Sequence, residues 1–172
     1  MNQLLSDLQH EFRRYKNLAD GALSQIDDEA FFRRPGEAVN PVALIVKHLA
    51  GNLQSRWADF LTTDGEKPTR NRDNEFVVEP YDSRAHLMEK WEAAWGTVFQ
   101  TVSNLKDDDL NKAVAIRGEP HTVAQALLRG LNHVAYHTGQ IAYLSRLWNP
   151  GGKWLTIAPG QSASHQAAYR RV

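Results

Sequence analysis

Residues 122–148 read TVAQALLRGLNHVAYHTGQIAYLSRLW, and this stretch decides the fold class. It opens with the form of a capping box, since Thr122 is followed by Gln125 at the spacing that satisfies free N–H groups at a helix start. Apolar residues then recur at three- and four-residue steps, the period of an amphipathic helix. The run NPGG at 149–152 breaks that period. The stretch is therefore predicted to be one long helix that buries one face.

The same helical period appears in three earlier segments. They span about residues 3–25, 41–61 and 83–105. Asn40 with Pro41 supplies an N-cap and a proline at the first helical position of the second segment, and Ser83 is the expected N-cap of the third. Helices with one-sided apolar faces most economically form a four-helix bundle. The sequence thus predicts an all-α fold with a single domain over residues 1–172.

The connection between the second and third of these helices is long and polar. It covers residues 62–82, contains Pro68 and Pro80 as helix breakers, and has no helical period. A connection of this length in a compact domain is more often functional than incidental, so it is predicted to form the wall of a site. Residues 110–120 could hold a short strand, and residues 149–172 form a tail without a firm period.

The composition removes several classes of function. Twenty Lys and Arg residues balance twenty Asp and Glu residues, which gives no global basic field for nucleic acid or an anionic membrane. The absence of cysteine excludes disulfides, thiolate metal sites and a cysteine nucleophile. The longest aliphatic run, residues 42–46, is far too short to cross a bilayer, and the N-terminus lacks the pattern of a secretory signal. We therefore expect a cytoplasmic protein with no nucleic acid and no membrane as partner.

Three of the seven histidines are candidates for chemistry. His133 and His137 are four residues apart on the last predicted helix, about 40° apart around its axis, so both can reach one ion. They border the apolar stripe of that helix, which places them toward the bundle interior. His48 lies at the edge of the apolar face of the second helix and is the natural third ligand if the two helices are neighbours. Taken alone, His48 is more readily interpreted as a core histidine bonded to a carbonyl.

A site with three histidine ligands leaves coordination positions open for water and substrate, as catalytic rather than purely structural metal sites do. Imidazole suits zinc, nickel, iron or copper, so the sequence predicts a divalent metal ion without choosing its identity. The remaining histidines lack a second candidate ligand at a suitable spacing and are interpreted as surface or capping residues. They are His10, His86, His121 and His165.

Three arginines suggest that the substrate carries an anionic group. Arg56 belongs to the second predicted helix, and Arg70 and Arg72 belong to the long loop. Their guanidinium groups could clamp a carboxylate or phosphate near the metal. A solvated ion-pair network with Asp73 and Glu75 explains the same residues equally well.

Three blocks in order resemble the DinB/YfiT-like superfamily of metal-binding four-helix bundles. The first is NP at 40–41 leading into HLAGNL at 48–53, and the last is HVAYHTGQI at 133–141. Between them, DGEKP at 64–68 and the following RNRDNEF at 70–76 resemble a branch still described as a domain of unknown function. The resemblance covers nearly the whole chain, through GQS at 160–162.

This resemblance implies that His48, His133 and His137 are the metal ligands, and that the fold is an up-down-down-up bundle with a long crossover, often dimeric. Characterised relatives include S-transferases and isomerases that use low-molecular-weight thiols such as bacillithiol, mycothiol or glutathione. The leading hypothesis is therefore an enzyme whose metal lowers the pKa of a thiol cosubstrate, with a small-molecule substrate and a homodimer expected.

In this hypothesis the residues around the metal bind the carboxylates of the thiol and orient ligands or bound water. They are Asn52, Arg56, Arg70, Arg72 and Gln140. A metal-dependent hydrolase is a second possibility, and it needs a general base such as Glu75 or Asp73. A bundle that binds a metal or small ligand for sensing or stress protection, without catalysis, is the third.

Overall fold

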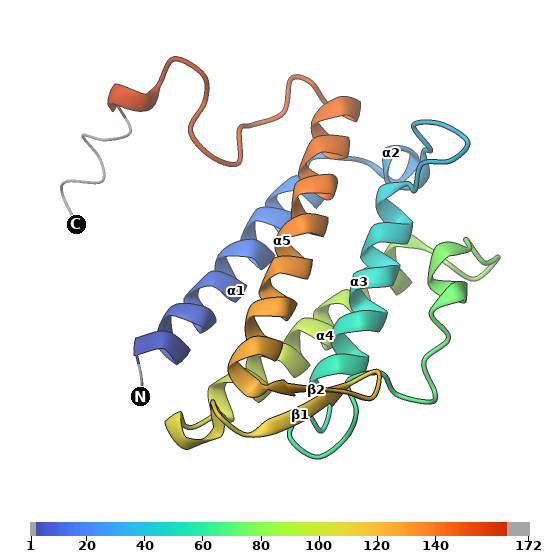
Figure 1. The fold of residues 1–172 in the computed structure, drawn as a ribbon. Coiled ribbons are helices and arrows are strands. Elements are labelled where there is room, and N and C mark those ends of the chain that lie inside the picture. The colour runs from blue at the N-terminus through green and yellow to red at the C-terminus, as the bar shows by residue number, and fades with distance from the viewer. Residues whose placement is uncertain (1–2, 165–172) are drawn as a thin grey trace.

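The computed structural model describes residues 3–164 and is mostly helical (Figure 1). The long helices are α1 (Gln3–Leu23), α3 (Val42–Trp57), α4 (Arg84–Asn104) and α5 (Val123–Trp148). The shorter elements are α2 (Asp28–Phe32), the 3-10 turns η1 (Asp73–Phe76) and η2 (Asp107–Asp109), and the strands β1 (Ala113–Ile116) and β2 (Glu119–Thr122). The prediction of a helical protein is confirmed, with a small hairpin added. His165 and the end of the predicted tail lie outside the described residues.

The long helices lie alongside one another around an apolar core. α1 packs beside α5 and α3 beside α4, and α3 also contacts α5 (Figure 1). Aromatic rings fill this core: the Phe12 ring of α1 meets the Trp57 ring of α3 edge-on at 5.5 Å, and Trp91 meets Trp95 within α4 at 5.6 Å. All four rings are fully buried. The contact between α3 and α5 brings together the two helices that carry the candidate ligands.

Two of the predicted helix starts are confirmed in detail. The Ser83 hydroxyl accepts a hydrogen bond from the His86 N–H, and Thr122 and Gln125 form a reciprocal capping box. The predicted start of the second helix is wrong by one residue. Pro41, not Asn40, is the N-cap of α3, because its extended backbone (ψ 166°) leaves it outside the helix while its carbonyl accepts from the first turn.

α3 ends at Trp57, earlier than the predicted limit near residue 61. Asp59 adopts a left-handed backbone conformation (φ 49°), which a right-handed helix cannot contain. Its carbonyl accepts hydrogen bonds from the Thr62 and Thr63 N–H groups. The apolar residues beyond Trp57, such as Phe60, therefore pack on the core from a turn.

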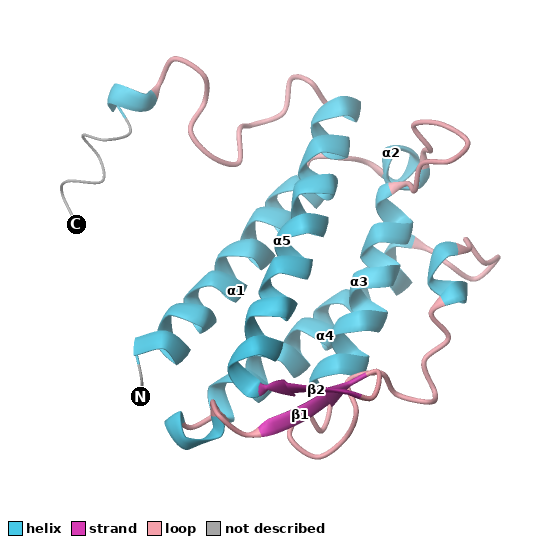
Figure 2. Cartoon of the chain, viewed as in Figure 1, coloured by secondary structure: helices cyan, strands magenta, loops and turns pink. Residues whose placement is uncertain are grey.

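The segment between α4 and α5 forms an antiparallel hairpin at one end of the helices (Figure 2). Its turn has positive φ at both Arg117 (55°) and Gly118 (75°), as a tight two-residue hairpin turn requires. The Asp64 carboxylate accepts hydrogen bonds from both of these N–H groups, at 2.8 and 2.7 Å. This contact fixes the start of the long loop to the hairpin.

The long loop is held against α3 along its length. Near its start, the Ser55 hydroxyl donates to the Gly65 carbonyl at 3.1 Å. At its end, the Lys47 ammonium donates to the Val77 carbonyl and to the Asp82 carboxylate at 2.9 and 2.6 Å. Between these anchors, η1 lies against α3. The loop thus carries its polar residues to the outer side of His48.

Candidate metal centre

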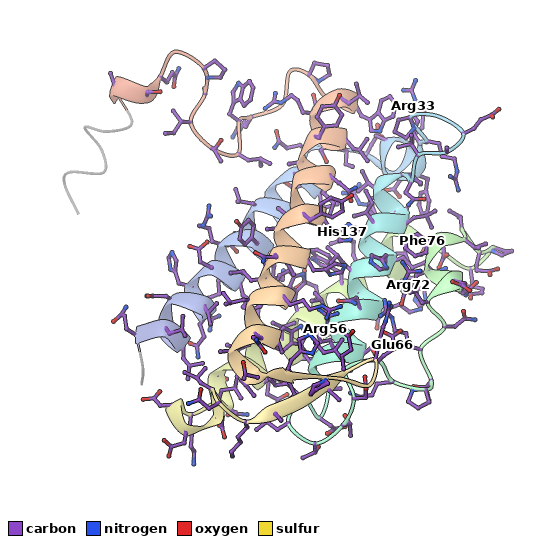
Figure 3. The ribbon with its side chains drawn as sticks, viewed as in Figure 1. Arg33, Arg56, Glu66, Arg72, Phe76 and His137 are labelled. Atoms are coloured by element: carbon purple, nitrogen blue, oxygen red, sulfur yellow. The ribbon has the colours of Figure 1, made fainter. Side chains whose placement is uncertain are left out.

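The three histidines that the sequence grouped converge in the structure. His48 comes from α3, and His133 and His137 from α5; one nitrogen of each lies within 4.8 Å of the others, so the three could hold a metal ion. The His133 Nε2 atom is 3.3 Å from His48 Nε2 and 3.2 Å from His137 Nε2. Ligands placed tetrahedrally at the usual Zn–N distance lie roughly 3.3–3.4 Å apart. The spacing therefore fits a small divalent cation, and Figure 3 shows His137 between α5 and α3.

Burial keeps the two histidines of α5 neutral. Loss of hydration lowers the pKa of His133 to about 3, and the nearby His137, His48 and arginine charges act in the same direction. Burial also lowers the pKa of His137 to about 4, against a hydrogen bond to Gln140 that raises it. A metal ligand needs an imidazole with a free lone pair. Both rings meet that requirement at neutral pH.

Hydrogen bonds at the opposite ring nitrogen set the direction of two rings. His48 Nδ1 lies 2.8 Å from Glu75 Oε2, and His137 Nδ1 lies 2.7 Å from Gln140 Oε1. Because a carboxylate and an amide oxygen only accept, each Nδ1 carries a proton, and each Nε2 faces the centre. His133 Nδ1 has no hydrogen-bond partner among the described residues. Two of the three rings are thus oriented for binding a metal.

Glu75 is itself held firmly. Arg70 donates two parallel hydrogen bonds to its carboxylate, from Nε to Oε1 and from Nη2 to Oε2, both 2.7 Å long. Arg70 Nη1 also donates to the Glu66 carboxylate at 3.0 Å. Burial alone would raise the pKa of Glu75, but the hydrogen bonds from His48 and Arg70 outweigh it and hold the pKa below the ordinary value. The carboxylate is therefore ionised and fixed toward His48.

Gly51 makes room for this carboxylate. It lies on α3 less than one turn after His48, and a Cβ at this position would collide with the Glu75 side chain. Any side chain here would move Glu75 away from the helix. The glycine in the HLAGNL block is therefore required for steric reasons. The sequence alone did not reveal this requirement, because Glu75 lies 24 positions further along the chain.

The arginines predicted to bind substrate have three different environments. Arg70 is occupied by Glu75 and Glu66, so it is not free for an anion. Arg72 is exposed and lies over the Phe76 ring at 5.1 Å. The predicted network with Glu75 exists for Arg70 only, and Asp73 is exposed and forms no ion pair with these arginines among the described residues.

Arg56 is the unusual arginine. It is only 7% exposed, and its Nε has no hydrogen-bond partner among the described residues. Loss of hydration lowers its pKa to about 10, and the charges of Arg129 and Arg70 add to this effect. Asn52, one turn earlier on α3, is also buried with an unpaired Oδ1. Buried polar groups normally have partners, so this pair is suited to a polar ligand.

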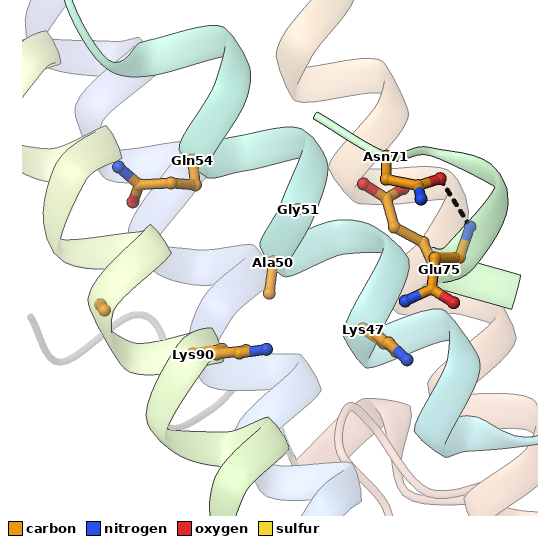
Figure 4. A pocket seen from close by; sticks show the side chains of 9 residues that line it. Lys47, Ala50, Gly51, Gln54, Asn71, Glu75 and Lys90 are labelled. Carbon is orange, nitrogen blue, oxygen red and sulfur yellow. Dashed lines mark hydrogen bonds between the residues drawn. The ribbon is translucent and has the colours of Figure 1, made fainter. Parts of the chain in front are cut away.

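Two cavities flank Glu75 and the histidines. One, of about 600 Å³, meets the cluster at His48 and His137 and includes Gln140 in its wall. The other, of about 460 Å³, lies between α3 and α4 behind Glu75, where Lys47, Lys90 and Gln54 line it (Figure 4). None of the three histidines lines this second cavity. A ligand of the metal centre therefore enters from the first.

The other described histidines lie outside the cluster. His10 is exposed and His86 half-buried, while His121 accepts a hydrogen bond from Arg129 at 2.8 Å near the hairpin. None of them joins a group that could hold a metal among the described residues.

Comparisons with known proteins show a family and a fold. Residues 1–161 match the family described as "Protein of unknown function (DUF1572)". No curated protein matches the chain. A solved structure, the "conserved protein of locus from Enterococcus faecalis", is similar with a TM-score of 0.64 and 16% identity, covering 86% of this chain and 98% of its own. At this identity the likeness concerns the fold alone.

Proposed function

The chain belongs to the family described as a protein of unknown function (DUF1572), and from its site we propose a divalent-metal-dependent enzyme that conjugates a low-molecular-weight thiol. The observation that carries the proposal is the convergence of three imidazoles, two of them kept neutral by burial, beside an open cavity. Three protein ligands leave at least one position on a tetrahedral ion for an exogenous group. A purely structural site would be closed by a fourth protein ligand.

A zinc, nickel or iron ion held by these histidines would supply Lewis acidity and lower the pKa of a bound thiol. Since the chain contains no cysteine, the sulfur must belong to the substrate. In the reaction the thiolate sulfur forms a bond to an electrophilic carbon, the leaving group departs with the electron pair of the broken bond, and the thiol proton passes to water.

The protein's own groups position the reactants. Glu75 and Gln140 orient His48 and His137 through their Nδ1 atoms. Arg56 binds the carboxylate of the thiol, a role supported by its unpaired buried Nε, and Asn52, whose unpaired Oδ1 accepts a hydrogen bond, orients bound water. Arg72 adds positive charge at the exposed side of Phe76. Arg70, which the sequence grouped with the substrate-binding arginines, instead holds Glu75.

We extend the proposal to the architecture and assembly. The four long helices and the crossover from α3 to α4 support a four-helix bundle of the DinB/YfiT-like type. The family resemblance also favours a homodimer. Static light scattering on the purified full chain should give twice the mass of the 19.4 kDa chain, whereas a single-chain mass would reject the dimer.

A conjugation screen tests the enzymatic proposal. Metal-loaded protein is mixed with glutathione, bacillithiol or mycothiol and a chromogenic electrophile, and the same mixtures are run with the His133→Ala variant. We expect turnover with at least one thiol that is lost in the variant. Absence of metal-dependent turnover with all three thiols would instead favour a protein that binds metal or a small ligand for sensing or stress protection.

The hydrolase alternative is tested on model esters without added thiol. It requires a general base close to the metal. Both oxygens of Glu75 are engaged by Arg70 and His48, and Asp73 is exposed, which disfavours either residue as that base. Metal-dependent ester hydrolysis without thiol would overturn the transferase proposal.

A further inference from the structure

We propose that the 600 Å³ cavity beside His48 and His137 binds the second substrate, and that this substrate is an uncharged, largely aromatic or aliphatic electrophile. This inference rests on the proposed function, because it names what the thiol would be joined to. It concerns the part of the cavity wall beyond the two histidines, where no arginine takes part.

The cavity walls come from three separate parts of the chain. α5 contributes one side, the segment before α3 and its first turn contribute a second, and Phe76 of η1 a third. The apolar and aromatic lining residues are Pro35, Ala38, Val39, Ile45, Phe76, Tyr136, Tyr143, Leu144 and Leu147. Apolar walls with a few polar groups are typical of small-molecule sites, and about 600 Å³ is within their usual size.

The lining selects against charge. Apart from the two histidines, its polar side chains are the neutral groups Asn40, Gln140 and the tyrosine hydroxyls, and no Lys, Arg, Asp or Glu takes part. An ionised group placed here would lose hydration without gaining a partner of opposite charge. Asn40 and Gln140 could still donate to a carbonyl or nitro oxygen. A neutral molecule with a polar reacting end therefore fits best.

The exposure of the side chains in the cavity wall also favours an apolar ligand. Tyr143 is 71% exposed, Tyr136 64% and Leu147 44%, although all three line one concave surface. Apolar side chains that gather around a cavity gain most when a ligand removes them from water. Because His48 and His137 line the same cavity, a ligand that covers these side chains lies next to the metal centre.

The test uses full-length protein loaded with Co²⁺, whose visible spectrum reports ligands that enter its coordination sphere. Imidazole and 4-phenylimidazole are titrated in parallel, because they offer the same donor atom and differ by one neutral aromatic ring. Burial of that ring in the cavity should make 4-phenylimidazole bind at least about tenfold more tightly. Imidazole-4-carboxylate should show no such gain.

Two matched variants separate the cavity from general surface effects. Leu147→Glu places a charge in the cavity wall, while Leu128→Glu changes a leucine of similar exposure (48%) on the same helix but outside the cavity. We expect Leu147→Glu to remove the preference for 4-phenylimidazole and Leu128→Glu to retain it, with unchanged affinity for imidazole in both. Light scattering confirms that neither variant changes the oligomeric state.

The outcomes distinguish this inference from the proposed function. Equal affinity for the two imidazoles would overturn the apolar substrate site and leave the metal centre standing. If Co²⁺ does not bind, the metal proposal fails, and the cavity is judged by the neutral fluorophore N-phenyl-1-naphthylamine. If the fluorophore binds to the wild type and to Leu128→Glu but not to Leu147→Glu, the cavity is supported. If it binds equally to all three proteins, the cavity is rejected.

Discussion

The histidines of the cluster are prepared for a metal in different ways. Burial keeps His133 neutral, Gln140 turns the His137 ring, and Glu75 turns the His48 ring. The orienting contacts act on Nδ1 and leave Nε2 toward the centre. The site therefore depends on residues that never touch the metal.

Replacement of Glu75 by glutamine tests this dependence. The amide keeps the shape but loses the charge that favours proton donation by His48 Nδ1, and Arg70 loses its ion-pair partner. We expect the affinity for Zn²⁺ to fall by about 10- to 100-fold, measured by competition with a chromogenic chelator. Asp73→Asn, an exposed change in the same 3-10 turn, is the control. Equal affinity in both variants would show that Glu75 does not support the ligand.

Replacement of Gly51 by alanine tests the close approach of Glu75 to α3. Alanine normally stabilises a helix relative to glycine, but here its Cβ would displace the Glu75 carboxylate. We expect weaker Zn²⁺ binding in the single variant, and little further loss when Gly51→Ala is added to Glu75→Ala. The same chelator competition applies to all three variants. A loss of equal size in both backgrounds would mean that Gly51 acts independently of Glu75.

At the scale of elements, the α3–α5 contact decides whether the ligands meet. Gly130 on α5 lets the Trp57 ring of α3 approach closely, since a Cβ at residue 130 would meet that ring. The ring is fully buried and packed against Phe12 and Phe60, so it has little room to move. Gly130 lies less than one turn before His133, and the spacing of the two helices there sets the spacing of the ligands.

Gly130→Ala should therefore destabilise the protein by about 1–3 kcal/mol, because it overpacks a rigid contact. Gly139→Ala on the same helix has open space around its Cβ and should instead be neutral or stabilising by up to about 1 kcal/mol. Urea unfolding of metal-free protein measures both. Similar effects of the two substitutions would contradict the proposed close packing.

The end of the long loop depends on the ion pair between Lys47 and Asp82. The Asp82 side chain is 1% exposed and that of Lys47 9%. Burial raises the pKa of Asp82, but the hydrogen bonds from Lys47 and from the Glu79 N–H outweigh it, so the pKa lies below the ordinary value. A carboxyl group of this kind stabilises the fold above its unfolded pKa of about 3.9, and the contribution is lost as pH falls through the lower folded pKa.

Asp82→Asn should accordingly cost about 3 kcal/mol at neutral pH, because it leaves Lys47 buried without its counter-charge. The difference from the wild type should stay constant from about pH 7 to 5 and shrink below about pH 4. Asp28→Asn, which removes an exposed carboxylate paired with Arg84, should cost less than about 1 kcal/mol. Urea unfolding across this pH range measures the three proteins, and a difference that grows with acid would contradict the assignment.

The sequence predicted the elements whose patterns are local. The long helices and the caps at Ser83 and Thr122 follow from apolar period and side-chain hydrogen bonds within one turn. The sequence did not predict α2 and η1, because each is too short for a helical period of apolar residues to be recognised. Glu75 was grouped with the arginines but not assigned to His48, because that contact spans 27 positions and depends on how the loop folds back.

At the scale of the whole molecule, the zero net charge does not reflect how charged and apolar residues are distributed around the site. The net charge is zero, yet the site contains two unlike environments. One is the buried Arg56, whose Nε has no hydrogen-bond partner among the described residues, and the other is the apolar cavity, which Arg56 does not line. No helix in the described part of the chain is long and apolar enough to cross a bilayer. These two environments are the basis on which we propose a thiol with a carboxylate and a neutral electrophile as the ligands.

Metal analysis of untagged protein, purified without chelators, tests the central claim most directly. The convergence of His48, His133 and His137 predicts close to one divalent metal ion per chain by elemental analysis, and loss of that metal in His133→Ala. A folded His121→Ala variant, changed outside the cluster, should retain it. Substoichiometric metal in the wild type that His133→Ala leaves unchanged would contradict the three-histidine centre.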